Sequence, residues 1–270
     1  MNNDIFGSQI ITSKSNPLVK EVIELSEKKF RNNKKLFKFD GIKLFKEAID
    51  FKLKIRYIVL ENEKEFTKDT VELIKAISND VKIFCVRSDI FEKMTDEMAP
   101  QGIITVCEFS VNCRSIDSIG MSEKAIIFES IRDPGNLGTI LRSAVAFGIN
   151  NVVLTDDCVD IYSSKVIRSS MGAFFKLNIY QSGNIRDAIS YFKTQNRRVI
   201  ATVLDKKSLI LGKDKIDSTD VFVFGNEGHG LNEETIKECT DSLFIPIENN
   251  TESLNVASAS SVIMWEISKK

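Results

Sequence analysis

The stretch that decides the fold is IPIENNTESLNVASASSVIMW, which runs from Ile245 to Trp265. Its apolar start continues Leu243 and Phe244 and is typical of the end of a buried strand. A polar loop, ENNTES, follows, and a run of small residues after Asn255 predicts a helix. The first amide groups of a helix have no partner within it, so the loop and the helix start together predict a binding surface.

The sequence before this stretch alternates between strands and helices. Near-continuous apolar strands are expected at Ala125–Ser130, Asn151–Asp156, Arg198–Leu204, Asp220–Gly225 and Leu243–Ile247. Helical periodicity is found at Thr139–Phe147, Ile185–Gln195, Asn232–Cys239 and Ser253–Ser268. This alternation predicts an α/β domain whose parallel sheet is covered by helices on both faces.

The first 110 residues have a shorter alternation of the same kind. Helices are expected from Asn16 and Pro17 onward and at Gly41–Phe51, Thr70–Ser78 and Asp89–Thr95, and strands at Ile55–Asn62, Val81–Val86 and Gly102–Phe109. The polar, turn-rich residues from Ser110 to Glu123 indicate a linker. We therefore expect a small α/β domain at 1–110, a linker at 111–123 and a larger domain at 124–270.

Composition limits the class of protein. With 43% hydrophobic and 28% charged residues, the chain has a globular composition. No apolar run approaches the roughly 18 residues of a membrane span, and no basic start followed by an apolar stretch predicts a signal peptide. Five scattered cysteines form no CxxC pair and no zinc-like spacing. Reduced thiols, a cytoplasmic location and no metal site are the expectations.

Charge is distributed unevenly although the net charge is only −1. Residues 14–56 contain 13 Lys and Arg against 6 Asp and Glu, whereas residues 205–270 contain 7 basic and 12 acidic residues. Within the basic part, KKFRNNKKLFK (Lys28–Lys38) reads as a basic turn with Phe30 and Phe37 interleaved. Such a segment predicts contact with phosphate, and an ordinary solvated lysine-rich face is the alternative.

One candidate site segment is DPGNLGTILRSAVAFGI, from Asp133 to Ile149. It follows an expected strand, with Asn136 before the helix and Arg142 inside it. In open α/β sheets the functional crevice lies beyond the carboxyl ends of the strands, which is where this turn is expected. The alternative is that Asn136 only caps the helix and Arg142 is a surface charge.

A second candidate segment is VFGNEGHGL, from Val223 to Leu231. Its glycines are spaced G-x-x-G-x-G rather than G-x-G-x-x-G, which argues against a standard dinucleotide fold. Glu227 lies between two glycines, an unusual place for a merely solvated acid. His229 is the chain's one histidine, and a lone loop histidine is more often incidental than catalytic.

The three segments together supply Asn136, Arg142, Glu227, Ser253 and Asn255. This set is polar, mostly neutral and without an obvious base for proton transfer. It suits the binding of a polar ligand and the orientation of a reaction whose electrophile is already activated.

The motifs N-x-G-T-x-x-R-x-A-x-A-F-G, F-G-N-E-G-x-G-L and I-P-I…E-S-L-N-V, in this order, resemble those of the SpoU/TrmH group of RNA 2′-O-ribose methyltransferases in the SPOUT superfamily. KVIRSSMGAFFKLNI (Lys165–Ile179) is also similar to this group. RNNKKLFKFDGIKLFKEAI and APQGIITVCEF resemble the ribosomal-protein-like substrate-binding domain of many members. The sequence departs from the pattern at Asp40, which is usually Glu, and at Asn249-Asn250, where a glycine is common.

The resemblance implies S-adenosylmethionine as the cofactor. It places the cofactor against backbone groups of Gly225, Ile245 and Leu254, with Thr202 near the end of its strand. It also implies a deep trefoil knot, with the C-terminal helix threaded through an earlier loop, and a homodimer.

For the reaction, Arg142 matches the family's essential arginine. A guanidinium titrates above about 12 and is a poor base at neutral pH. We therefore expect Arg142 to hold a neighbouring phosphate and to stabilise charge on the 2′-oxygen, while a phosphate or water takes the proton. Asn136 is expected to fix Arg142 or the ribose, and Glu227 to anchor its loop or help position Arg142. Ser253 and Asn255 are expected to hold cofactor and substrate oxygens.

The expected substrate is structured RNA, most simply ribosomal RNA because of the extra N-terminal domain. The residues expected to contact its phosphates are Lys28, Lys29, Arg31, Lys34, Lys35, Lys38 and Arg168. A transfer-RNA enzyme, a resistance enzyme that modifies ribosomal RNA and a non-catalytic RNA-binding or assembly factor with the same fold are the alternatives.

Overall fold

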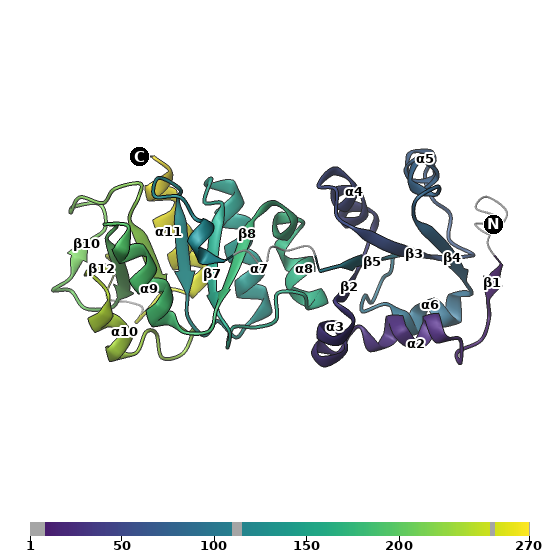
Figure 1. Cartoon of the computed structure of the whole chain (residues 1–270), viewed down its shortest axis with the longest axis horizontal. Helices are drawn as coiled ribbons and strands as arrows, with labels where there is room; N and C mark the ends of the chain where they lie inside the picture. Colours follow the sequence, from purple (N-terminus) through teal and green to yellow (C-terminus); the bar gives the residue numbers. More distant parts are fainter. Residues whose placement is uncertain (1–8, 110–114, 249–251, 270) are drawn as a thin grey trace. The chain divides into compact units, whose positions relative to one another are not determined.

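The computed structural model describes residues 9–109, 115–248 and 252–269. The chain forms two compact units, which are considered separately (Figure 1). Unit 1 comprises Met1–Ser110 with Asp160–Phe175, and unit 2 comprises Val111–Val159 with Lys176–Lys270. The Asn249-Asn250 pair, Cys113 and residues 111–114 of the expected linker lie outside the described residues.

Unit 1 contains a mixed five-stranded sheet in the order β1-β4-β3-β5-β2. Its strands are β1 (Ile10–Ile11), β2 (Leu36–Asp40), β3 (Ile55–Glu61), β4 (Lys82–Val86) and β5 (Ile103–Glu108). β1, β4 and β3 are parallel, whereas β5 runs antiparallel to both β3 and β2. The expected small α/β arrangement is therefore present in unit 1.

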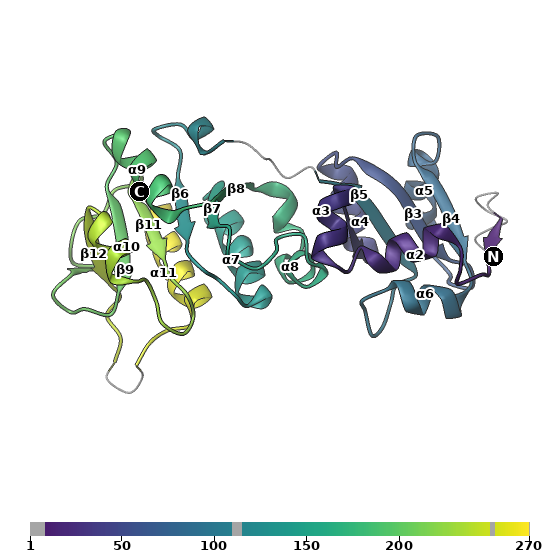
Figure 2. The ribbon, with the colours of Figure 1, turned by 60° about the horizontal axis from the view of Figure 1, so that its bottom comes forward.

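Helices cover both faces of the unit 1 sheet (Figures 1 and 2). They are α2 (Pro17–Glu24), α3 (Lys28–Lys34), α4 (Ile42–Asp50), α5 (Lys68–Ile77), α6 (Ser88–Met94) and α8 (Ser164–Ser170). Val22 of α2 and Phe91 of α6 pack on one face, and Phe45 of α4 and Ile74 of α5 pack on the other. The side chain of Asn16 caps α2 by accepting from the N–H of Leu18 at 2.9 Å, as the sequence predicts.

The Lys28–Lys38 segment is not the basic turn that the sequence pattern indicated. It forms α3, ends at Lys35 in the left-handed conformation (φ +55°), and continues as β2. Pairing with β5, which is distant in sequence, gives this lysine-rich stretch its strand conformation. Phe37 is fully buried, with its ring centroid 5.1 Å from that of Tyr162, so it belongs to the core and cannot stack on a base.

Unit 2 contains a seven-stranded sheet in the order β10-β12-β9-β11-β6-β7-β8, in which every neighbouring pair is parallel. The strands are β6 (Ala125–Phe128), β7 (Asn151–Thr155), β8 (Asn178–Ser182), β9 (Val199–Val203), β10 (Leu209–Ile210), β11 (Val221–Phe224) and β12 (Asp241–Phe244). The parallel sheet was predicted, but β8 and the two-residue β10 were not.

Three helices of unit 2 connect parallel strands, and the fourth, α11, follows the last strand. They are α7 (Pro134–Ala146), α9 (Ile185–Thr194), α10 (Glu233–Glu238) and α11 (Val256–Ser268). α9 packs on one face of the sheet through Ala188, Ile189 and Phe192. α7 and α11 pack against each other, with 2.7 Å between the hydroxyl oxygens of Ser143 and Ser261 (Figure 1). Among the described residues, no helix is long and apolar enough to cross a membrane.

The start of α7 differs from the expectation. Asp133 is the N-cap and its carboxylate accepts from the N–H of Asn136 at 2.8 Å, while Pro134 occupies the first helical position. Asn136 is therefore inside the first turn rather than before the helix. This position lets its side chain face the neighbouring loops at the carboxyl edge of the sheet.

Candidate functional site

A pocket of about 370 Å³ lies at the carboxyl ends of β9, β11 and β12. The start of α11 and the Asn226–Gly230 loop close its sides. Six residues that the sequence placed at a ligand site line it together: Thr202, Gly225, Glu227, Ile245, Ser253 and Leu254. They come from three strand ends and one helix start, and this meeting point is where parallel α/β sheets bind ligands.

The pocket combines an apolar interior with a polar edge. Leu231, Leu243 and Val256 supply apolar walls, and Asn226 and Glu227 supply polar groups. Its volume is within the range of roughly 300–1,000 Å³ that small-molecule sites occupy. These residues fit a nucleoside cofactor, whose flat base needs apolar walls and whose sugar needs polar partners.

The Asn226–Gly230 loop is held in a tight shape. Backbone hydrogen bonds join Asn226 and Gly230 in both directions, at 3.2 and 3.0 Å. A Cβ atom on Gly225 would lie 2.2 Å from the carbonyl carbon of Gly230, so any larger residue would push the loop away. The glycine spacing seen in the sequence therefore reflects a close approach of two backbone segments at the pocket wall.

A chain of hydrogen bonds, which we call the relay, joins the three sequence motifs. The amide nitrogen of Asn255 donates to the side-chain oxygen of Asn136 at 2.9 Å. The amide nitrogen of Asn136 in turn donates to Glu227 Oε1 at 3.1 Å. Asn255 also caps α11, because its side-chain oxygen accepts from the N–H of Ala257 at 2.9 Å. The relay thus fixes the start of α7, the Glu227 loop and the start of α11 relative to one another.

Glu227 is the anionic end of the relay and acts as an acceptor. Its carboxylate receives the backbone N–H groups of Asp133 at 3.0 Å and Arg132 at 3.2 and 3.3 Å. Burial raises the pKa of Glu227, but the hydrogen bonds from Asp133, Asn136 and Arg132 outweigh it and leave the pKa below its usual value. A carboxylate with a lowered pKa and several donors is a loop anchor and a poor proton acceptor.

Arg142 is exposed on α7. No residue in the described parts of the chain forms a hydrogen bond or an ion pair with it. Asn136 does not bind Arg142 in this structure, because both functional groups of its side chain bind Glu227 and Asn255, and the alternative that Asn136 fixes the ribose stays a prediction. Its guanidinium remains available to a ligand outside the described chain.

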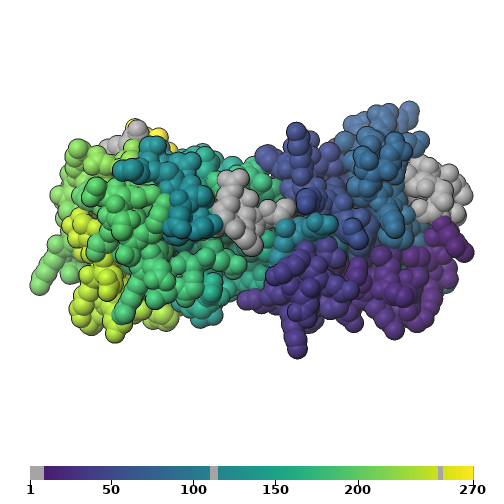
Figure 3. Space-filling model, in the orientation of Figure 1, coloured from purple at the N-terminus to yellow at the C-terminus, as the bar shows by residue number. Residues whose placement is uncertain are grey.

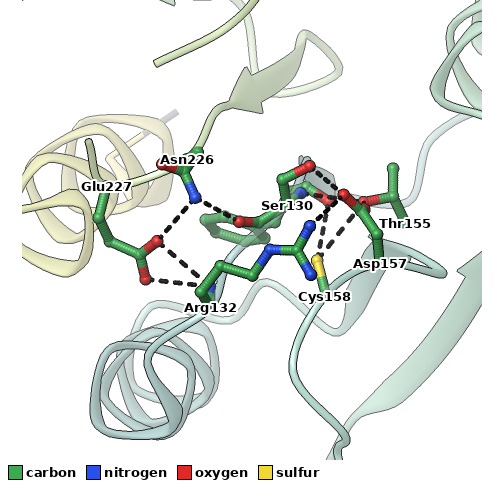
Figure 4. A network of polar contacts seen from close by, with 8 residues as sticks. Ser130, Arg132, Thr155, Asp157, Cys158, Asn226 and Glu227 are labelled. Atoms are coloured by element: carbon green, nitrogen blue, oxygen red, sulfur yellow. Dashed lines mark hydrogen bonds and ion pairs between the residues drawn. The ribbon is translucent and has the colours of Figure 1, made fainter. Parts of the chain in front are cut away.

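A second network lies beside the relay (Figure 4). Thr155 donates to Asp157 Oδ1 at 2.5 Å, the hydroxyl of Ser130 donates to the same carboxylate, and Arg132 Nη2 donates to Asp157 Oδ2 at 3.0 Å. Asn226 Nδ2 binds the carbonyl of Ser130 at 2.8 Å, which connects this network to the pocket loop. This network was not predicted from the sequence, although the polar residues that follow both β6 and β7 are a usable signal.

The residues expected to contact RNA phosphates in unit 1 have different surroundings. Lys28, Lys29, Lys34 and Lys35 are exposed on or next to α3, whose surface is purple in Figure 3. Arg31 and Lys38 were expected to contact phosphate, and the structure contradicts this. Arg31 binds the carbonyls of Leu25 and Ser26 and the carboxylate of Asp160, and Lys38 binds the carbonyl of Met94. Burial lowers the pKa of Lys38.

Arg168 of α8 is half-exposed, and its Nη1 donates to Glu97 Oε1 at 2.7 Å. His229 is exposed at the pocket wall. In the residues that the structure describes, no group of three or more His, Cys, Asp or Glu is arranged to hold a metal ion.

A model of the SpoU rRNA methylase family matches residues 123–265, which contain the pocket, the relay and Arg142. The chain belongs to this family. A model of the MRM3-like substrate-binding domain matches residues 16–105. The family predicted from the three motifs is thereby confirmed.

Two relatives and one solved structure match this SpoU-family chain over nearly their whole length. An uncharacterized tRNA/rRNA methyltransferase of Synechocystis is 31% identical over 95% of this chain and 92% of its own. The 23S rRNA (guanosine-2′-O)-methyltransferase RlmP of Bacillus subtilis is 26% identical over 95% of this chain and 98% of its own. The S-adenosylmethionine-bound crystal structure of an rRNA methyltransferase from Sinorhizobium meliloti superposes with a TM-score of 0.84, at 28% identity, over 97% of this chain and 98% of that one. The α/β fold is confirmed.

Proposed function

We propose that this protein transfers a methyl group from S-adenosylmethionine to a ribose 2′-hydroxyl of ribosomal RNA. The observation that carries the proposal is the pocket at the carboxyl edge of the unit 2 sheet. All four residues expected to contact the cofactor line it, and the relay connects it to the helix that bears Arg142. Membership of the SpoU rRNA methylase family and the similarity to RlmP support ribosomal RNA as the substrate.

The cofactor-binding residues are Thr202, Gly225, Ile245 and Leu254. Leu254 and Ile245 provide apolar contacts, and the missing side chain of Gly225 brings the backbone close to the ligand. Thr202 Oγ1 donates to the carbonyl of Val223 at 2.8 Å, which fixes the ends of β9 and β11 against each other. When bound, S-adenosylmethionine supplies a methyl group already activated by its sulfonium.

Arg142 binds the substrate phosphate and stabilises the negative charge that develops on the 2′-oxygen. Its exposed guanidinium has no partner among the described residues, so no internal ion pair has to break before RNA binds. Arginine cannot act as the base at neutral pH, and the proton passes to a substrate phosphate or to water.

The relay holds the helix that bears Arg142. Asn255, Asn136 and Glu227 connect α11, α7 and the pocket loop, and so they fix where Arg142 stands relative to the cofactor. Ser253 lines the same pocket and contacts the cofactor or the substrate ribose. Alignment of the nucleophile with the methyl group contributes several kcal/mol to lowering a barrier of this kind.

Residues 1–110 act as the RNA-binding domain, 111–123 as the linker and 124–270 as the methyltransferase domain. The match of residues 16–105 to a substrate-binding domain supports this division. Lys28, Lys29, Lys34 and Lys35 provide phosphate contacts because their side chains are exposed. Arg168 contributes after exchanging its contact with Glu97 for one with RNA.

The active form is a homodimer of knotted subunits in the cytoplasm, where ribosomal RNA is modified. Trp265 and Val262 are exposed on α11 at 50% and 39%, and an exposed apolar pair on a helix whose other side is buried suits a subunit interface. The small, buried Ala257 and Ser260 of the same helix suit passage through a close-fitting loop.

Methyl transfer tests the proposal directly. The protein is incubated with methyl-labelled S-adenosylmethionine and either ribosomal or transfer RNA, and the labelled nucleoside is then identified by digestion. The expected product is a 2′-O-methyl nucleoside in ribosomal RNA. Label in transfer RNA alone would reassign the substrate. Tight RNA binding without any transfer would show a non-catalytic RNA-binding factor.

A further inference from the structure

Arg132 lies at the site, yet none of the three sequence motifs includes it. Its backbone N–H donates to both oxygens of Glu227, at 3.3 and 3.2 Å. Arg132 therefore lies beside the relay, one residue before the N-cap of α7. The side chain is 62% exposed, and its guanidinium points towards Asp157, away from Glu227 (Figure 4).

The ion pair of Arg132 with Asp157 engages only one of the three guanidinium nitrogens. Only Nη2 takes part, at 3.0 Å from Asp157 Oδ2. Nε and Nη1 have no hydrogen-bond partner within the described ranges. Exposed ion pairs of this kind contribute about 0–1 kcal/mol, whereas a phosphate can accept two parallel hydrogen bonds from one guanidinium.

Arg132 is not the only group that stabilises the charge of Asp157. The hydroxyls of Ser130 and Thr155 both donate to its carboxylate. Burial raises the pKa of Asp157, but these two hydrogen bonds and the charge of Arg132 outweigh it and leave the pKa below its usual value. The aspartate remains anchored if the arginine moves away.

Arg198 shows how a structural arginine is held in the same unit. Its Nε and Nη2 bind both oxygens of Asp220, at 3.1 and 2.6 Å. Its Nη2 also donates to the carbonyl of Lys215 at 3.0 Å. Arg132, with one bond and two unoccupied nitrogens, is held much more loosely than Arg198.

We propose that Arg132 is an RNA-binding residue that contacts a backbone phosphate next to the methylated nucleotide, and that Asp157 orients its guanidinium until the phosphate replaces it. This inference rests on the proposed function, since it assumes that RNA enters this edge of the sheet. Arginine suits the task because its planar guanidinium can pair with two phosphate oxygens at once.

Arg132→Ala should weaken binding of ribosomal RNA about tenfold and reduce the slope of log affinity against log salt by about 0.7–0.9, the loss of one phosphate contact. Arg132→Lys should keep the slope but not the full affinity. The control is Lys215→Ala, which removes an exposed charge paired with Asp217 at 3.4 Å. Lys215 lies beside the amino end of β9, at the opposite edge of the sheet. Its substitution should therefore leave RNA binding unchanged.

A double-mutant cycle separates this role from a structural one. If Arg132 only neutralises Asp157, then Arg132→Ala should have no effect in an Asp157→Asn background. If Arg132 contacts phosphate, the tenfold loss and the smaller salt slope should remain in that background. Affinity for S-adenosylmethionine, measured by titration calorimetry, should be equal in all four proteins, which shows that each variant is folded.

Equal RNA affinity and salt slope for Arg132→Ala and Lys215→Ala would overturn the inference. The proposed function would stand in that case, because wild-type methyl transfer is measured separately. Failure of the wild-type protein to bind RNA or to transfer methyl groups would overturn the proposed function itself, and the inference with it.

Discussion

The pocket edge of unit 2 and the basic Lys28–Lys38 segment of unit 1 were both identified from polar residues close together in sequence. At the pocket edge, residues up to 119 positions apart form one relay, from Asn136 to Asn255. In the basic segment, residues only a few positions apart differ in burial, since Lys35 is exposed and Lys38 is buried against Met94. A count of charges therefore does not show which side chains are exposed together, whereas polar residues at the ends of successive parallel strands do meet at one edge of the sheet.

Arg142→Ala should have the largest effect on the pocket side of this comparison. Loss of an electrostatic partner in the transition state costs about 10²–10³-fold in kcat. Affinity for S-adenosylmethionine should stay within about twofold, because Arg142 lies outside the pocket lining. Steady-state kinetics and titration calorimetry measure the two quantities. Arg142→Lys is the control, and its activity should lie between those of the other two proteins. Loss of cofactor binding in Arg142→Ala would show that the role given to Arg142 is wrong.

Removing exposed charges from the basic segment should have the next largest effect. Alanine at Lys28, Lys29, Lys34 and Lys35 together should weaken RNA binding by more than tenfold and lower the salt slope by about 3. Binding assays at several salt concentrations measure both.

Lys38→Met is the matched control within the basic segment. It removes a buried charge and its hydrogen bond to Met94, so it should change stability and leave the salt slope unaltered. An altered salt slope in Lys38→Met would contradict the burial seen for this side chain.

Asn255→Ala should produce a smaller effect by cutting the relay at one end. The variant loses the cap of α11 and the bond to Asn136, and the free energy of unfolding should fall by about 1–2 kcal/mol. Activity should fall about tenfold, since α7 loses one of its fixed contacts. Asn255→Asp keeps the capping oxygen but has no N–H for Asn136. It should therefore regain the lost stability but not the lost activity. Equal activity in Asn255→Asp and the wild type would show that the relay does not contribute to activity.

The smallest expected effect is a pH dependence in unit 1. Burial raises the pKa of Asp40 to about 6, partly offset by a hydrogen bond from Thr95. Because the folded pKa is above the unfolded value, this carboxyl group favours folding most at low pH. That contribution should be lost, on the order of 1 kcal/mol, as pH rises from about 4 through about 6. Denaturant unfolding of the wild type and Asp40→Asn should diverge over this range. Parallel curves would contradict the raised pKa.

The sequence predicted the parts of the fold whose signal is local. Strands such as β6 and β11 are short apolar runs followed by turn residues, and Asn16 and Pro17 mark the start of α2. β10 has two residues and therefore no periodicity of its own, and β2 owes its strand conformation to pairing with β5. Contacts between distant segments give such elements their strand conformation, and a local sequence pattern does not reveal those contacts.

The same reasoning applies to the site. The residues expected to contact the cofactor were named from the family resemblance of the motifs, and they line one pocket. Arg132 and Asp157 were missed because their partnership depends on β6 and β7 being neighbours, which becomes known only with the strand order. The bonds of Asn136 to Glu227 and Asn255 were not predicted for a related reason, since its side-chain direction depends on where α7 begins.

Hydrogen–deuterium exchange with and without S-adenosylmethionine tests whether the pocket edge of unit 2 holds the cofactor. Exchange should slow at 202–204, 225–231, 245–247 and 252–256 when the cofactor is added, with no change at 28–38. Protection at 28–38 together with unchanged exchange at the pocket segments would contradict it.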